Sequence, residues 1–268
     1  MANIPSILAL DFDGVICDGL IEYFEVAWRT YCQVWFPTNE TPPDGLASQF
    51  YRLRPVIETG WEMPVLVKAL LEGIAEAEIL QDWQSINQKI LLADNLNAKA
   101  ISTKLDKLRD EWIATDLEGW LSLHRFYSGV VDKLKTTIAS TTKLYIISTK
   151  EGRFVQQLLY QQGIELGSEE IFGKEMKRPK YEILRELIQL HKVPTETVWF
   201  VEDRLKTLQI VDQQTDLKDV KLFLADWGYN TPSEKTTAQN DPRIQPLSLS
   251  QFGQDFSQWL VDGTALLG

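Results

Sequence analysis

Four short apolar runs, each ending abruptly in polar residues, constrain the fold of this 268-residue chain more than any other feature. Short runs without polar alternation are typical of parallel strands that are buried on both faces. Segments with helical spacing lie between the later runs. Strands that alternate with helices predict right-handed crossovers, and therefore an α/β fold with a three-layer, parallel-sheet, Rossmann-like core. The apolar runs occupy residues 7–10, 144–147, 198–201 and 220–224, and the helical segments occupy residues 154–160, 181–190 and 205–211.

The gap between residues 10 and 144 is far longer than one crossover helix needs. Apolar side chains from Ile21 to Trp35 recur at steps of three and four, which places them on one helical face. We therefore expect a helical domain at residues 20–124, inserted into a core formed by residues 1–19 and 125–268. Further helices are expected around residues 65–78, 83–93 and 98–113, and ordered loops at residues 37–43 and 51–64.

The C-terminal part gives weaker signals. Residues 231–246 are polar and contain proline, which predicts a loop. Phe252, Phe256 and Trp259 follow at helical spacing, so we expect a short amphipathic helix there that packs on the core.

Composition excludes several classes of protein. The net charge of −11 disfavours binding to nucleic acid, which requires a basic face. The two cysteines, Cys17 and Cys32, are too few for a disulfide framework and favour a reducing compartment. We find neither a signal peptide nor an apolar run of transmembrane length. The expectation is a cytoplasmic protein that binds neither nucleic acid nor membrane.

Asp11 and Asp13 directly follow the first apolar run, and Gly14 allows the chain to turn there. Strand alternation predicts that both carboxylates point to the same side, at the sheet edge where α/β proteins bind ligands. There Asp11 could attack a phosphoryl group, while Asp13 protonates the leaving oxygen and later activates water. Asp-x-Asp-Gly is equally compatible with a turn or a helix cap.

Glu202 and Asp203 end the third apolar run in the same way. An acidic pair after a strand is usually a helix cap. If the first and third strands are neighbours, however, these two carboxylates converge with Asp11 and Asp13, and their repulsion is costly without a cation. Oxygen ligands of this kind suit Mg²⁺, so the sequence predicts a magnesium site.

Polar and basic residues elsewhere predict a phosphate site. Ser148 and Thr149 end the second run, where hydroxyls and backbone N–H groups can bind an anion; for Thr149, capping is the alternative. Lys180 begins the helix that leads into the third run and could reach the phosphate. Lys177 is a competitor for that role, and a basic run before a helix is often solvated surface.

These segments resemble, in order, the four motifs of the haloacid dehalogenase superfamily: Asp11-Phe-Asp-Gly-Val, the strand ending at Ser148, Lys180-x-Glu-Ile-Leu and Phe-Val-Glu202-Asp203. The helical insertion lies where that superfamily has a type C1 cap. The Ser-Thr-Lys run and Asp226-Trp-Gly-Tyr resemble phosphoglycolate phosphatase-type members.

The resemblance implies that Asp11 is the nucleophile and Asp13 the general acid/base, while Ser148 and Lys180 bind phosphate. It also implies that Asp11, the Asp13 carbonyl and Asp203 hold Mg²⁺. Glu202 stands where many members have Gly, but a Glu-Asp pair also occurs in β-phosphoglucomutase-like members, so we expect Glu202 close to the metal.

Asp13 favours phosphate esters over haloacids, because dehalogenases of the superfamily typically lack the second Asp. We therefore expect a Mg²⁺-dependent phosphatase that acts on a small phosphorylated metabolite through an aspartyl-phosphate. A phosphomutase of the β-phosphoglucomutase type uses the same aspartates but excludes water. A catalytically silent binding or scaffold protein on the same fold is the alternative from another class. The oligomeric state is not specified by the sequence.

Substrate specificity is expected to come from the helical insertion. Residues 51–62 combine charge, aromatic surface and chain-turning residues. Our hypothesis is that Arg52 or Arg54, with Glu58 and Trp61, contacts the leaving group, since Arg suits an anionic partner. Alternatively, both Arg residues form surface ion pairs and Trp61 packs in the interior of the insertion.

Overall fold

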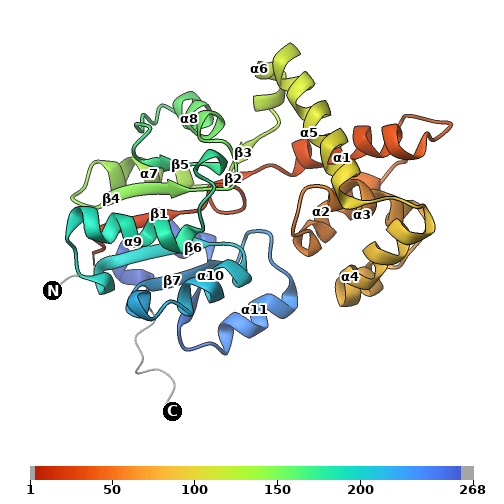
Figure 1. The fold of residues 1–268 in the computed structure, drawn as a ribbon. Coiled ribbons are helices and arrows are strands. Elements are labelled where there is room, and N and C mark those ends of the chain that lie inside the picture. Colours follow the sequence, from red (N-terminus) through yellow and green to blue (C-terminus); the bar gives the residue numbers. More distant parts are fainter. Residues whose placement is uncertain (1–3, 261–268) are drawn as a thin grey trace. The chain divides into compact units, whose positions relative to one another are not determined.

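The computed structural model describes residues 4–260 and contains two compact units (Figure 1). The first, called here the sheet unit, comprises residues 4–18 and 126–260 of the described chain. The second, the helical unit, comprises Gly19–Arg125. A pair of two-residue strands, β2 (Cys17–Asp18) and β3 (Arg125–Phe126), forms where the chain passes from one unit to the other.

Within the described residues, six parallel strands form the main sheet, in the order β5-β4-β1-β6-β7-β8. The four predicted strands are all present, and β1 lies between β4 and β6. The register aligns Leu10 with Ile146 and Val201, so the residues that follow these three strands emerge at one edge. The strands are β1 (Ile7–Leu10), β4 (Lys143–Ile147), β5 (Ile171–Phe172), β6 (Val198–Glu202), β7 (Lys221–Ala225) and β8 (Ile244–Leu247).

Helices cover both faces of this sheet, which gives the expected three layers (Figure 1). Every residue of β1 is fully buried, as expected for a strand without polar alternation. On one face Ile7 and Phe200 belong to a cluster with Leu184 of α9 and Leu208 of α10. On the other face, the Trp199 ring lies 5.7 Å from that of Trp259. The longer helices of this unit are α7 (Val130–Ile138), α8 (Gly152–Gln161), α9 (Lys180–His191), α10 (Leu205–Asp212) and α11 (Pro232–Gln239); short 3-10 turns span Lys174–Met176, Thr195–Thr197 and Thr215–Leu217.

The loop predicted at residues 231–246 is wrong, because this segment forms α11 and β8. Thr231 and Glu234 form a capping box with Pro232 in the first turn, so local signals outweigh the polar composition. Pro246 is tolerated because β8 is the edge strand of the sheet. The single C-terminal helix is also wrong: the chain forms α12 (Leu249–Phe252) and a 3-10 turn (Phe256–Gln258) instead.

The helical unit consists of helices that pack mainly around α1. The loop predicted at residues 51–64 is wrong at both ends, because one helix extends into it as far as Leu53 and another begins at Glu62. Pro64 is accommodated in the first turn of the second helix. The helix predicted at 65–78 ends early, where Gly73 adopts a positive φ of 78°. The helices are α1 (Leu20–Trp35), α2 (Leu46–Leu53), the 3-10 turn Arg54–Val56, α3 (Glu62–Leu71), α4 (Glu76–Ala93), α5 (Ala98–Thr115) and α6 (Leu117–Leu121).

A buried carboxylate links three helices of this unit. Glu22 on α1 is fully buried and accepts hydrogen bonds from Arg109 at 2.7 Å and from the Trp120 indole at 3.0 Å. A buried charge is tolerated when it is paired and hydrogen-bonded in this way. No helix in the part of the chain described here has the length and hydropathy needed to cross a membrane.

Candidate metal and phosphate site

Three buried carboxylates meet at the edge where β1 and β6 end. Asp11 follows β1, Glu202 is the last residue of β6, and Asp203 follows it. One oxygen from each lies within 4.8 Å of the others, the one such group among the described residues. Their exposed fractions are 7%, 0% and 1%. The convergence depends on β1 and β6 being neighbours, because two adjacent parallel strands deliver their ends to the same place.

Lys180 contacts two members of this cluster. It is the first residue of α9, and its Nζ lies 2.8 Å from Asp11 Oδ1 and 2.7 Å from Glu202 Oε2. Lys177, by contrast, is exposed and adopts a left-handed backbone conformation in the preceding turn. The lysine that meets the carboxylates is therefore Lys180.

The surroundings of these groups raise their pKa values, which is the effect of burial and excess negative charge. Burial and the neighbouring Glu202 raise the pKa of Asp11 to about 7, although Lys180 acts in the opposite direction. Burial and Asp11 raise the pKa of Asp203 to about 6. Burial also raises the pKa of Glu202. The pKa of Lys180 is raised by the Asp11 and Glu202 carboxylates, although burial acts in the opposite direction. One ammonium does not balance three carboxylates, so the site favours an additional cation.

Divalent metal chemistry fits these residues. Mg²⁺ prefers oxygen ligands and usually keeps several waters, so one or two carboxylates are sufficient. Asp203 is oriented by the Tyr229 backbone N–H, which donates to its Oδ2 at 2.7 Å. Glu202 is more fully engaged: Oε1 accepts the backbone N–H groups of Asp203 and Arg204 at 3.1 and 3.0 Å, and Oε2 faces Lys180. Glu202 thus fixes the lysine and the loop around the cluster.

Two glycines allow this close packing. Gly14 has φ +86°, and a Cβ there would lie 2.1 Å from Asp203 Oδ2. A Cβ on Gly228 would lie 2.3 Å from Asp203 Cβ and 2.5 Å from the Gly14 carbonyl. All three distances are shorter than the approach that real Cβ atoms make. The backbone can approach Asp203 only because these positions lack side chains.

Gly14→Ala is expected to destabilise the protein and displace Asp203. Gly45→Ala is the matched control, since Gly45 has φ +83° but open space where a Cβ would be. Each should lose about 1 kcal/mol of unfolding free energy from the positive φ. Gly14→Ala should lose about 1–3 kcal/mol more from the clash, together with Mg²⁺ affinity. Urea unfolding and calorimetry with Mg²⁺ measure both effects; equal losses in the two variants contradict the close-approach argument.

Asp13 lies beside the carboxylate cluster in sequence but is less buried. Its Oδ1 is 3.4 Å from the Lys150 Nζ, and its backbone bridges to Cys17. Ser148 is buried and its Oγ accepts the Lys150 backbone N–H at 3.0 Å, whereas Thr149 is exposed. Lys150 was not among the predicted site residues, although this lysine directly follows Ser148 and Thr149 in the sequence.

The residues predicted to read the substrate lie in the helical unit. Arg52 is exposed and pairs with Glu76 through two hydrogen bonds, of 3.1 and 2.5 Å. Arg54 donates to the Ile57 carbonyl at 3.1 Å and lies 5.0 Å from the centre of the Tyr23 ring. Glu58 is exposed and lines a cavity of about 270 Å³, and half-buried Trp61 precedes α3. The Arg52 contact is the surface ion pair considered as the alternative.

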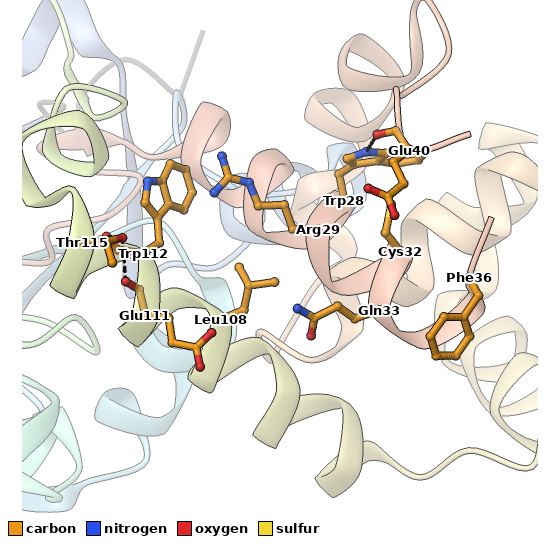
Figure 2. Close-up of a pocket in the computed structure, with 10 residues that line it drawn as sticks. All are labelled: Trp28, Arg29, Cys32, Gln33, Phe36, Glu40, Leu108, Glu111, Trp112 and Thr115. Carbon is orange, nitrogen blue, oxygen red and sulfur yellow. Dashed lines mark hydrogen bonds between the residues drawn. The ribbon is translucent and has the colours of Figure 1, made fainter. Parts of the chain in front are cut away.

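A larger cavity of about 610 Å³ lies between α1 and α5 of the same unit (Figure 2). Figure 2 shows Trp28 and Cys32 of α1 opposite Leu108 and Trp112 of α5. The Arg29 guanidinium lies 3.9 Å from the centre of the Trp112 ring. None of the predicted site residues lines this cavity.

Comparison with known proteins identifies the family of this chain. The family model described as haloacid dehalogenase-like hydrolase matches residues 71–211, more than half of the chain. The chain belongs to this family. The match includes Ser148, Lys180, Glu202 and Asp203 but begins after Asp11 and Asp13. The first motif of this haloacid dehalogenase-like hydrolase therefore lies outside the matched residues.

Solved structures share the fold over nearly the whole chain. A haloacid dehalogenase-like family hydrolase from Streptococcus pneumoniae superposes with a TM-score of 0.57 at 16% identity, covering 93% of this chain and 95% of that one. A predicted phosphoglycolate phosphatase from Haemophilus somnus gives 0.57 at 14% identity, with 86% and 88% covered. A predicted phosphatase from Clostridium acetobutylicum gives 0.54 at 12% identity, with 93% and 97% covered. Comparison with curated proteins gave no match.

Proposed function

We propose that this haloacid dehalogenase-like hydrolase is a Mg²⁺-dependent phosphatase that hydrolyses a small-molecule phosphate monoester through an aspartyl-phosphate. The observation that carries the proposal is the contact of Lys180 with Asp11, beside the acidic residues that end β6. This arrangement provides a carboxylate nucleophile, a cation that can hold phosphate and oxygen ligands for a metal. The phosphatases among the solved structures of this fold support the choice of ester.

Each residue has a distinct role in the proposed reaction. An Asp11 oxygen attacks phosphorus, and the bond from phosphorus to the leaving oxygen breaks. Asp13 protonates that oxygen and then removes a proton from the water that hydrolyses the acyl phosphate. Ser148 and Lys180 hold the phosphate oxygens, with Thr149 at the rim. Asp11, Asp203 and the Asp13 carbonyl would hold Mg²⁺, with Glu202 beside them. When bound, the ion would neutralise charge on the carboxylates and on the phosphate.

The helical unit is proposed to act as the cap, with residues 20–124 inserted in the core. In this role Arg54, Glu58 and Trp61 would contact the leaving group, and Arg52 would do so only if it leaves Glu76. The substrate is proposed to be a small metabolite rather than nucleic acid. A cytoplasmic location agrees with both cysteines being free thiols.

Release of inorganic phosphate tests the proposal. Purified protein with Mg²⁺ is incubated with p-nitrophenyl phosphate, phosphoglycolate, sugar phosphates and nucleotides, with and without EDTA. Metal-dependent phosphate release is expected for at least one ester. Conversion of a sugar phosphate to its isomer without phosphate release indicates a mutase, and absence of turnover in every reaction indicates a binding protein; either result contradicts the proposal.

Mg²⁺ affinity is expected to depend on pH. Asp11 and Asp203 have raised pKa values, of about 7 and 6, so below these values they bind protons in the metal-free protein. Metal and protons compete for the same oxygens, so affinity rises with pH and is lost as pH falls through this range. Calorimetry should show affinity at least about tenfold weaker at pH 5.0 than at pH 7.5. Equal affinity at both pH values contradicts the assignment of these ligands.

A further inference from the structure

Tyr229 is bonded at three atoms to different parts of the sheet unit. It lies in the loop after β7 and is 5% exposed. Its backbone N–H donates to Asp203 Oδ2 at 2.7 Å, and its carbonyl accepts from the Arg204 guanidinium at 2.8 Å. Its hydroxyl donates to Asp18 Oδ1 at 2.9 Å. One residue therefore connects a carboxylate of the acidic cluster to the end of β2.

The hydroxyl end of Tyr229 meets both segments through which the chain passes between the units. Asp18 is the last residue before the helical unit, and Tyr127 follows the first residue after it. The Tyr127 side chain is hydrogen-bonded to Tyr229, and its backbone N–H donates to the Ile16 carbonyl at 3.2 Å. We call residues 16–18 and 126–127 the linkers.

The loop that carries Tyr229 leaves little room for independent movement. Trp227 donates from its indole N–H to the Val15 carbonyl at 3.1 Å. Asn230 donates to the carbonyls of Asp203 and Ala225, at 3.2 and 2.7 Å. Gly228 packs directly against Asp203, as described above. A shift of Asp203 is therefore resisted by, or transmitted to, the Tyr229 ring.

We propose that Tyr229 is a positioning residue that couples Mg²⁺ binding at Asp203 to the order of the linkers. This inference rests on the proposed function, from which it takes the metal. When Asp203 binds the ion, its position is fixed, and the bonds of Tyr229 then restrain Asp18 and Tyr127. By linkage, ordered linkers strengthen Mg²⁺ binding by the same factor.

Hydrogen exchange at the linkers tests the coupling, with calorimetry of Mg²⁺ binding on the same proteins. In wild type, saturating Mg²⁺ should slow amide exchange in peptides covering residues 16–20 and 124–128 at least about fivefold. Tyr229→Phe keeps the backbone bond to Asp203 and the ring but lacks the hydroxyl. This variant should still bind Mg²⁺, with an affinity reduced by no more than the factor by which Mg²⁺ slows exchange in wild type. In the variant, saturating Mg²⁺ should slow amide exchange in the linkers by less than about twofold.

Matched variants separate this role from a structural one. Asp18→Ala should reproduce Tyr229→Phe, and the double variant should add nothing. Asp18→Asn retains an acceptor for the hydroxyl and should behave as wild type. Tyr145→Phe removes another buried tyrosine hydroxyl, one bonded to His191, and should leave the Mg²⁺ effect intact. Equal protection in wild type and Tyr229→Phe overturns the coupling alone, whereas absence of Mg²⁺ binding to wild type overturns both the coupling and the proposed metal site.

Discussion

Asp11→Asn is expected to lower kcat for phosphate release by at least about a thousandfold, equivalent to roughly 4 kcal/mol of transition-state stabilisation. The amide has nearly the same shape as the carboxylate, but it cannot form the acyl phosphate on which the proposed reaction depends. Lys180 retains its 2.7 Å contact with Glu202, so the cation should stay in the site. The measurement is steady-state phosphate release with saturating Mg²⁺ and the best ester found.

Two further measurements make the Asp11 result specific. Asp216→Asn is the control, because Asp216 is an exposed aspartate paired with Arg185 and should change kcat less than about twofold. Acid-quenched single turnovers should trap phosphate on wild-type protein and not on Asp11→Asn. If the variant keeps a tenth or more of wild-type kcat, Asp11 is not the nucleophile.

The sheet could be predicted because buried parallel strands leave a clear signal in the sequence. The apolar runs before Asp11, Ser148 and Glu202 cannot alternate, since both of their faces are covered. Because β1 and β6 are adjacent, Asp11 meets Glu202 and Asp203, with ligand oxygens within 4.8 Å of one another. The predicted cluster was therefore a consequence of topology. Asp13, which the sequence also placed in this group, lies outside it and faces Lys150. The topology of the sheet does not decide between Lys180 and Lys177, because that choice depends on the turn before α9.

Other features depend on contacts that no local pattern reveals. The two residues of β5 pair with the end of β4 and are too few to show periodicity. The contacts of Lys150 with Asp13 and of Tyr229 with Asp203 arise from loops that the sheet brings together. In the helical unit, Arg52 looks like an anion-binding residue in sequence, but its partner is Glu76 on a different helix.

Lys180→Ala should destabilise the metal-free protein by about 3–5 kcal/mol, the range for removing one partner of a buried ion pair. The variant leaves Asp11 and Glu202 buried without the ammonium that contacts both. Their pKa values, already raised in the presence of Lys180, should rise further. When the pKa of a carboxyl group is higher in the folded than in the unfolded protein, the free energy of unfolding decreases as the pH rises toward and through the folded-state pKa. The reason is that the unfolded chain ionises at lower pH. The deficit should thus be large at pH 8 and small at pH 5, where both groups can be protonated.

Lys177→Ala is the matched control for this deficit. Lys177 lies three residues earlier in the same basic run but is exposed, so its loss should change the free energy of unfolding by less than about 0.5 kcal/mol at either pH. Urea denaturation at pH 5 and pH 8, with and without Mg²⁺, compares the two variants. Added Mg²⁺ should recover part of the stability of Lys180→Ala at pH 8, because the ion supplies positive charge to the same carboxylates. A deficit that is the same at both pH values would mean that Lys180 stabilises by packing alone and that its charge is not what the cluster requires.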